Sequence, residues 1–328
     1  MSGKSTGATL LAVVVTAASL TAGQAWADPA VAHVPGEVHF ATLTVSGVAH
    51  TLRHADGTWD GFGLVPNSTG LSSYVVSAIV AGEEHVLVEE YRNNHPPHYS
   101  SFKHRIRHAD GTWGSATITV PAVFDVAVAA VSGELHLVHR GYGSDTGHMV
   151  RRADGTWSHL PALPAPASGS VMGAAGHGGE LRLLVANPSA GTLSYHVAGA
   201  DGAWSPAVDV PFAPAALGVQ PSTVDVAQVG TVLHAVVRGS DGLLYHSMRH
   251  SNGAWDPFHG IGTQIPQPVD PVRDVSIAAS LDTLHVAVAT GDGLFHAIRV
   301  ANGTWQPFGD VEQEAGAVSS VKVTIAGT

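Results

Sequence analysis

The chain has 328 residues, of which 45% are hydrophobic and only 12% are charged, a composition too apolar for a disordered protein. Its formal net charge of −11 argues against nucleic acid or an anionic membrane as a partner, because both require a basic surface. The absence of cysteine excludes disulfides, cysteine-ligated zinc, iron–sulfur clusters and a thiol nucleophile. The 38 glycines and 19 prolines are typical of an all-β protein with many tight turns.

The first segment of the chain has the features of a secretory signal peptide. Lys4 provides a positive start, and residues 9–20 form an apolar stretch that is too short to cross a bilayer. Ala25-Trp26-Ala27 matches a cleavage site. We therefore predict that residues 1–27 are removed. The mature chain, residues 28–328, is then expected to be a secreted, extracellular protein with a single domain.

A short motif recurs six times after this segment, and every remaining tryptophan ends one copy of it. The copies are HTLRHADGTW (50–59), HRIRHADGTW (104–113), HMVRRADGTW (148–157), HVAGADGAW (196–204), HSMRHSNGAW (246–255) and HAIRVANGTW (296–305). Successive tryptophans are 54, 44, 47, 51 and 50 residues apart. A period near 50 residues accommodates four short strands and their turns, which is one blade of a β-propeller.

Each copy contains an Asp-Gly or Asn-Gly pair where the third strand of the unit should turn into the fourth. A two-residue hairpin loop of type I′ needs positive φ at both central positions, which Asx and Gly tolerate best. We therefore predict a type I′ turn in each unit, with the Asp residues acting as turn formers and not as acids. The pairs are Asp56-Gly57, Asp110-Gly111, Asp154-Gly155, Asp201-Gly202, Asn252-Gly253 and Asn302-Gly303.

The two ends of the mature chain complement each other. The C-terminus adds one strand, residues 318–327, that matches the opening strand of the other units, whereas the N-terminus begins with a second-strand equivalent at residues 36–45. The C-terminal strand can therefore complete the first blade, and such closure hides sheet edges that would otherwise promote aggregation. The sequence thus predicts an all-β, six-bladed propeller of four-stranded blades.

Histidine and arginine also follow the repeat. One histidine falls early in the second strand of most units, at His39, His85, His136, His234 and His285, with Arg182 in the fourth unit. Another falls in every third strand, at His50, His104, His148, His196, His246 and His296. An arginine follows the third-strand histidine after three residues in five units, at Arg53, Arg107, Arg151, Arg249 and Arg299. This odd spacing predicts that His and Arg point to opposite faces of a blade.

The strands LYHSMRHSNGAWDPF (244–258) and LFHAIRVANGTWQPFGDV (294–311) resemble the repeats of secreted bacterial propeller lectins of the Photorhabdus type, which are similar to tectonins and to fungal fucose lectins. The resemblance covers nearly all of the mature chain. It implies non-covalent binding of glycans or glycosylated surfaces in clefts between blades, with an aromatic ring stacked on the sugar. Similar propellers also serve as lectin subunits of actinobacterial umbrella toxin particles, so the resemblance also implies a possible protein complex as partner.

This chain departs from the relatives that it resembles. Photorhabdus-type lectins have seven blades. The six-bladed fungal lectins pair a recurring Arg with a recurring Glu to hold fucose, and we expect no recurring Glu here, so the resemblance does not imply fucose specificity.

The candidate sugar-binding residues have two interpretations. The tryptophans either fill the gaps between blades, as large aromatic side chains commonly do, or form stacking platforms for sugars, and both roles are compatible if one ring edge stays exposed. The candidates are Trp59, Trp113, Trp157, Trp204, Trp255 and Trp305, with Arg53, Arg107, Arg151, Arg249, Arg299 and Tyr245. The fourth unit has Ala198 in place of Arg and one residue fewer, so we expect its cleft to be the inactive one.

Other functions are weaker predictions. The insertion at residues 91–101, with Tyr91, Arg92, His95, His98 and Tyr99, is either a binding loop or an ordinary surface loop. ADGTW lacks the spacer of a sialidase Asp-box, and no carboxylate pair or hydrolase motif is recognisable, so we predict no enzymatic activity. We also predict no cofactor and no metal site, because equivalent histidines lie one blade apart. A protein-interaction platform is the main alternative to a lectin.

Overall fold

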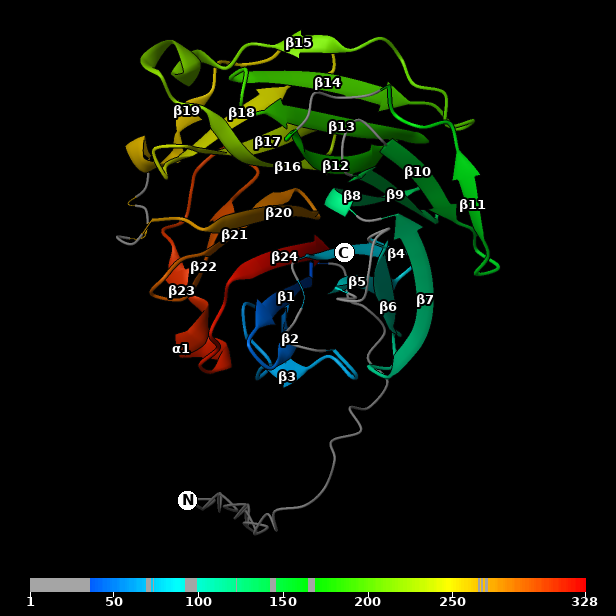
Figure 1. Ribbon diagram of the computed structural model, residues 1–328. Helices are drawn as coiled ribbons and strands as arrows, with labels where there is room; N and C mark the ends of the chain where they lie inside the picture. The colour runs from blue at the N-terminus through cyan, green and yellow to red at the C-terminus, as the bar shows by residue number, and fades with distance from the viewer. Residues whose placement is uncertain are drawn as a thin grey trace, which may run out of the picture.

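Six four-stranded antiparallel sheets make up the described part of the chain, and they are arranged as blades around a central axis (Figure 1). The computed structural model describes residues 36–328, except 69–71, 73, 92–98, 122, 142–145, 165–168, 265, 267, 269 and 270. The predicted six-bladed β-propeller is therefore confirmed. Within the described residues, no helix is sufficiently long and apolar to span a membrane.

The blades share one order of strands, from the axis outwards. The innermost strands are β24 (Lys322–Gly327), β4 (Val75–Val80), β8 (Val123–Val131), β12 (Val171–His177), β16 (Pro221–Val229) and β20 (Asp274–Ser280). The second strands are β1 (Val38–Thr44), β5 (Glu83–Tyr91), β9 (Glu134–Gly141), β13 (Glu180–Asn187), β17 (Val232–Gly239) and β21 (Thr283–Ala289).

The outer half of each blade carries the repeated motif. The third strands are β2 (Gly47–Arg53), β6 (Tyr99–Arg107), β10 (Thr146–Arg151), β14 (Thr192–Ala198), β18 (Leu244–Arg249) and β22 (Leu294–Arg299). The fourth strands are β3 (Gly63–Leu64), β7 (Trp113–Pro121), β11 (Trp157–Leu160), β15 (Val208–Val210), β19 (His259–Gly260) and β23 (Gly309–Asp310). In the part of the chain that the structure describes, three short helices lie in the connections: η1 (Ala213–Leu217), η2 (Ile261–Thr263) and α1 (Val311–Ala315).

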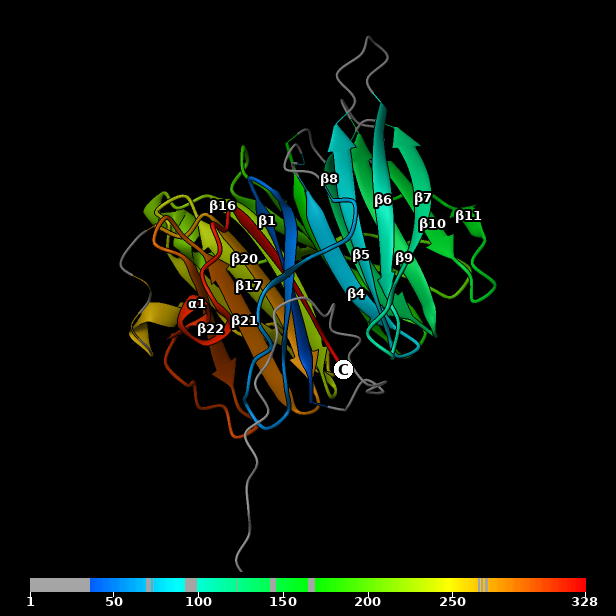
Figure 2. The ribbon, with the colours of Figure 1, turned by 90° about the horizontal axis from the view of Figure 1, so that it is seen from below.

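The first blade is built from both ends of the described chain. Strand β24 pairs antiparallel with β1, with Phe40 opposite Ile325 and Ala41 opposite Thr324. Figures 1 and 2 show the red C-terminal strand beside the blue β1. A Cβ atom on Gly327 would lie 2.0 Å from the carbonyl oxygen of Ala279, so only glycine lets β24 approach the sixth blade this closely. The predicted closure of the ring by the C-terminal strand is confirmed.

The inner strands of neighbouring blades are linked by side chains that accept backbone N–H bonds. The Asp125 carboxylate accepts from the Met172 N–H at 2.5 Å, and the Asp274 carboxylate accepts from the Val323 N–H at 3.0 Å. The Asp225 carboxylate accepts from the Ile277 N–H at 2.8 Å. An inner edge strand has N–H groups with no partner strand, so these acceptors avoid the cost of leaving them unpaired.

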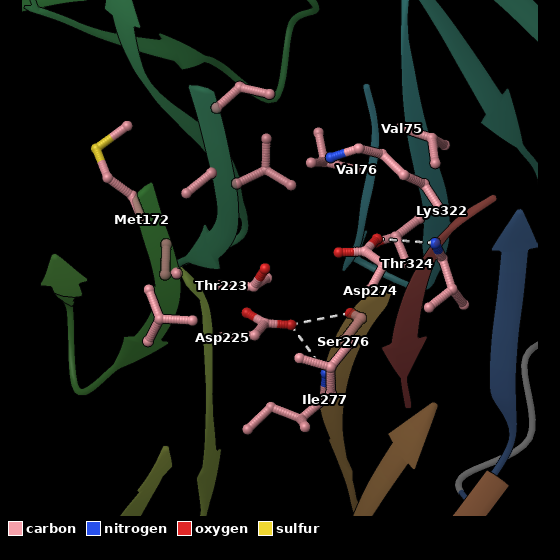
Figure 3. A pocket seen from close by; sticks show the side chains of 18 of the residues that line it. Val75, Val76, Met172, Thr223, Asp225, Asp274, Ser276, Ile277, Lys322 and Thr324 are labelled. Carbon is pink, nitrogen blue, oxygen red and sulfur yellow. Dashed lines mark hydrogen bonds between the residues drawn. The ribbon is translucent and has the colours of Figure 1, made fainter. Parts of the chain in front are cut away.

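Around the axis these inner strands enclose a cavity of about 130 Å³ (Figure 3). Lys322 and the three aspartates line it, and the Lys322 ammonium lies 4.6 Å from the centre of the Tyr74 ring. Burial raises the pKa values of Asp125 and Asp225 to about 7, although the N–H bonds that each accepts act in the opposite direction. The channel therefore holds carboxyl groups that resist ionisation.

The hydrophobic core is divided among the blade interfaces. Among the described residues, each of the six clusters of buried apolar side chains joins two neighbouring blades and includes one motif tryptophan at its edge or within it. A blade therefore has little core of its own, and stability depends on contact with both neighbours.

We predict that removal of residues 318–328 prevents folding to a stable monomer. The truncated chain would expose the edge of β1 and open one side of the channel. Thermal melting and size-exclusion chromatography should show a large loss of melting temperature or aggregation. A synthetic peptide of residues 318–328 should restore folding in trans, whereas the same peptide with Ile325→Asp should not. A truncated chain that melts like the parent would contradict ring closure as a condition of stability.

A second prediction concerns the buried carboxyl of Asp225. Its folded-state pKa of about 7 lies above the ordinary 3.8, so the folded chain binds the extra proton and this group destabilises the fold progressively as pH rises from about 4 through 7. Asp225→Asn should therefore melt higher than the parent, by a difference that grows between pH 5 and 8. For a large domain, a gain of about 1 kcal/mol in the free energy of unfolding raises the melting temperature by roughly 2–4 °C.

The control for this prediction is Asp56→Asn, which removes an exposed turn carboxylate whose pKa lies below its usual value. The comparison must be a difference between variant and parent, because the buried histidines shift stability with pH in the opposite sense. A difference between Asp225→Asn and the parent that does not change with pH would show that this carboxyl is already ionised in the fold.

Candidate functional site

The repeated hairpin has a three-residue loop, so the predicted type I′ turn is wrong. In the first copy the His54 N–H donates to the Thr58 carbonyl and the Gly57 N–H donates to the His54 carbonyl, and only Gly57 has positive φ, at 92°. This pattern is a type I turn followed by a left-handed glycine. All six motif glycines have positive φ, and none of the preceding Asx residues does.

The Asx side chain holds this loop in every copy. Asp56 accepts hydrogen bonds from the backbone N–H of Thr58 at 2.9 Å and from its hydroxyl at 2.7 Å. The equivalent backbone bonds form at Thr112, Thr156, Ala203, Ala254 and Thr304. The bonds to Thr58 also lower the pKa of Asp56 below its usual value. These residues are turn formers, as predicted, and are not poised as general acids.

The hairpin places the repeat Arg and Trp directly opposite each other. Arg107 pairs with Trp113 and Arg151 pairs with Trp157 in the β-ladders, and isolated bridges join Arg53 to Trp59 and Arg249 to Trp255 in the same way. Directly opposed residues of an antiparallel pair point to the same face. Five blades therefore present a guanidinium and an indole together toward the preceding blade, whereas the fourth blade has Ala198 opposite Trp204.

The facing blade contributes an aromatic or imidazole ring to each tryptophan. The His50 ring lies edge-on to Trp113, with ring centres 5.4 Å apart, and the His296 ring lies edge-on to Trp59 at 5.6 Å. His50 lines one cleft with Arg107, whereas Arg53 of the same strand lines the next cleft. The prediction that His and Arg of one repeat face opposite ways is thus confirmed for this strand.

Two of the interfaces are hollowed into open clefts. The cleft between the first and second blades has a volume of about 740 Å³, and it is lined by His50, Asp60, Phe62, Arg107 and Trp113 among others. The cleft between the sixth and first blades has a volume of about 380 Å³. It is lined by Arg53, Trp59, His296, Gln306 and Glu314 among others. Trp59 and Trp113 are half-buried, so each ring both packs between blades and faces a cleft.

Two other interfaces are occupied by the chain itself. Trp305 is only 6% exposed, so its ring serves the core between the fifth and sixth blades. Trp204 donates its indole N–H to the Pro161 carbonyl at 3.0 Å, and a Cβ atom on the neighbouring Gly202 would lie 2.9 Å from Leu160. The expectation that the cleft of the fourth unit is inactive stays a prediction, and this filling supports it.

Tyrosines occupy the interface between the fourth and fifth blades. The Arg249 guanidinium lies over the Tyr195 ring, 4.5 Å from its centre, and Trp255 is edge-on to the same ring at 5.9 Å. Tyr245 donates its hydroxyl to Asp241 at 2.6 Å. These contacts engage both Arg249 and Tyr245 within the protein. The remaining candidate tryptophan, Trp157, is half-buried against His104 between the second and third blades.

The periodic histidines form hydrogen-bonded pairs inside the blade interfaces. Nδ1 of the second-strand histidine lies 2.8 Å from Nε2 of the third-strand histidine in the pair His85–His104, and 2.9 Å in the pair His285–His296. Burial lowers the pKa of His85 to about 4 and that of His285 to about 3. His85 and His285 are therefore neutral near pH 7, and each of these two pairs shares a proton donor and an acceptor.

The fourth unit has no such histidine pair, because its third-strand histidine is displaced by one position. His196 was expected at the position of the other third-strand histidines, but Tyr195 lies there, opposite Leu184 in β13. His196 points to the other face, where its Nε2 lies 3.0 Å from the Ser194 hydroxyl. The unit has therefore lost no residue between β14 and Trp204. Its histidine has moved by one position, which reverses its direction in a strand.

The prediction that no Glu recurs is also wrong. A glutamate begins the second strand in three blades, at Glu83, Glu134 and Glu180, and Glu37 directly precedes the second strand of the first blade. The glutamates of the first three blades bind the basic residue that follows the repeat Arg, as in the 2.6 Å contact between Glu83 and His108 Nδ1, and Glu180 binds Arg182. The tetrapeptide Gly-Glu-x-His, which occurs in the first three units, could have revealed this recurring glutamate from the sequence. These glutamates bind within their own blades and are absent from the linings of the two open clefts.

Residues 92–98, including Arg92, His95 and His98, lie outside the described residues, and no side-chain position is described for Tyr91 or Tyr99.

Comparisons with known proteins show the same fold in lectins. A mutant of Aleuria aurantia lectin in complex with alpha-methyl-L-fucoside superposes with a TM-score of 0.59 at 14% identity, over 84% of this chain and 88% of that one. BP39L lectin from Burkholderia pseudomallei gives 0.55 at 15% identity, over 83% and 79%. SapL1 lectin in complex with alpha methyl fucoside gives 0.55 at 13% identity, over 73% and 80%. No family model and no curated protein sequence matches the chain.

The burial of Trp305 leads to a prediction about stability. Trp305→Ala should destabilise the protein by about 3–5 kcal/mol, the usual cost of removing a buried large aromatic side chain. Chemical denaturation at neutral pH measures this loss. Trp59→Ala is the matched comparison and should cost less, because its ring is only half-buried against the neighbouring blade. Equal losses for the two variants would contradict the division between a packing and a cleft-lining tryptophan.

Proposed function

We propose that this protein is a secreted lectin that binds glycans non-covalently in two clefts, one between the first and second blades and one between the sixth and first. The observation that carries the proposal is the first of these clefts. There a half-buried indole, Trp113, and a guanidinium, Arg107, lie on one wall and face His50 on the other. The proposal concerns carbohydrate as a class and does not specify the sugar.

The chemistry of the cleft suits a saccharide. A pyranose ring has an apolar face of C–H groups, which packs well on an indole, and a rim of hydroxyls that need directional donors and acceptors. Arg107 supplies several N–H donors in a fixed plane, and Asp60 supplies acceptors across the same opening. A volume of about 740 Å³ accommodates a small saccharide. The shared fold with lectins bound to fucosides supports this class of ligand.

Two clefts on one rigid ring would favour surfaces over free sugars. The first blade contributes a wall to each, because Arg53 and Trp59 face the sixth blade while His50 faces the second. A site for one small sugar is usually weak, but two sites at a fixed separation gain avidity on a surface with many glycans. A sugar-coated cell surface is therefore the target that we propose.

Binding should depend on the cleft tryptophans. Trp113→Ala and Trp59→Ala should each weaken glycan binding about tenfold or more at their own cleft, equivalent to about 1.4 kcal/mol of lost stacking, and the double variant should lose binding. A glycan array of the mature chain identifies the ligand, and isothermal titration calorimetry measures affinity and stoichiometry. Trp204→Phe, in the filled interface, is the control and should bind like the parent.

The same experiments separate the alternatives. A parent protein that binds no glycan but captures a protein component of a secreted complex would identify an interaction platform. Turnover of a chromogenic glycoside would identify a hydrolase. Either result without glycan binding would overturn the proposed lectin function.

A further inference from the structure

Three ligand-type side chains converge at one point inside the interface between the first and second blades. They are His39 on β1, His50 on β2 and Glu84 on β5. Glu84 Oε2 lies 3.1 Å from His39 Nδ1 and 2.9 Å from His50 Nε2, and the two nitrogens are 3.3 Å apart. Among the described residues, these three side chains form a group that could hold a metal ion, because their ligand atoms all lie within 4.8 Å of one another.

The carboxylate is an exception to the repeat. Glu84 lies opposite Arg107 in β6, and the residues that lie opposite the repeat arginine in other blades are apolar: Val38, Leu135, Leu233 and Leu284. Leu181 holds the same place opposite Ala198 in the fourth blade. A blade interface therefore does not need a charged group here. The Glu84 side chain is 0% exposed, and burying a carboxylate is costly unless other groups compensate it.

The hydrogen bonds to the two histidines leave part of this carboxylate unsatisfied. Glu84 Oε2 accepts from both rings, whereas Glu84 Oε1 is buried with no hydrogen-bond partner among the described residues. The histidine pair is also more open than the others. Its nitrogens are 3.3 Å apart, compared with 2.8 to 3.0 Å in the four pairs that have no carboxylate.

These separations match the spacing of ligand atoms around zinc. With Zn–N and Zn–O bonds of about 2.0–2.1 Å, two corners of a tetrahedral site lie about 3.3 Å apart. The three observed separations lie between 2.9 and 3.3 Å, so only small side-chain shifts would admit an ion. Two imidazoles and one carboxylate are a common zinc ligand set. The other histidine pairs offer two ligands each, which are too few.

We propose that His39, His50 and Glu84 bind one Zn²⁺ ion that joins the first and second blades. His39 Nδ1, His50 Nε2 and a Glu84 carboxylate oxygen are three ligands, and a water molecule completes the coordination. His50 also lines the open cleft, so an ion would enter from that side. The ion would neutralise the buried carboxylate and connect the two blades. The proposal does not depend on sugar binding, because its ligands are complete without a saccharide.

The test is zinc binding by the mature protein after treatment with a chelator. Isothermal titration calorimetry in the presence of a weak competing chelator should give one Zn²⁺ per chain, and zinc should raise the melting temperature. Glu84→Leu installs the residue found in other blades and should abolish that site. Glu84→Gln keeps the shape and should weaken binding by at least the roughly 10–100-fold that follows loss of a supporting partner of a zinc ligand.

The matched control is His136→Asn in the third blade, which removes one member of a histidine pair that has no carboxylate. It should keep the single zinc site at nearly the parent affinity. Co²⁺ in place of zinc should give the visible absorption of a four-coordinate site in the parent and in His136→Asn but not in Glu84→Leu. Absence of binding above the chelator in the parent, or binding by Glu84→Leu at nearly the parent affinity, would overturn the proposal.

Discussion

The packing of one tryptophan between each pair of neighbouring blades is the contact on which the whole ring depends. Each indole belongs to the cluster that joins its blade to the preceding one, and a ring from that blade meets it within about 6 Å. The blades have no large core of their own, so these interfaces carry the hydrophobic stabilisation. The motif recurs because each interface needs a large aromatic side chain and the hairpin that positions it.

Closing the ring imposes a second requirement at the axis. Six inner strands approach one another closely, as shown by Gly327 against Ala279, without forming a continuous hydrogen-bonded sheet. Buried carboxyl groups such as Asp274 meet the N–H groups of the next blade. Without these buried acidic side chains, backbone N–H groups in the narrow channel would have no hydrogen-bond acceptor, which is costly.

The same repeat produces different interfaces. Trp113 and Trp59 face open clefts, Trp204 is covered by the Pro161 segment, and Trp305 lies in the core. At Trp204 the difference comes from a neighbouring segment and not from the tryptophan itself. A repeat protein can therefore keep one packing rule around its ring while only some of its interfaces remain available to a ligand.

The sequence by itself determined the number of blades, the closure by residues 318–327, the turn-forming role of Asp56 and its equivalents, and the alternation of His50 and Arg53 across a strand. These features follow from local periodicity, because tryptophan spacing, Asx-Gly pairs and strand alternation are written along the chain. The tertiary structure alone decided which tryptophans remain accessible, that Tyr195 replaces His196 in its interface, and that Glu84 meets His39 and His50. These features depend on side chains from different blades, whose proximity arises only when the ring closes.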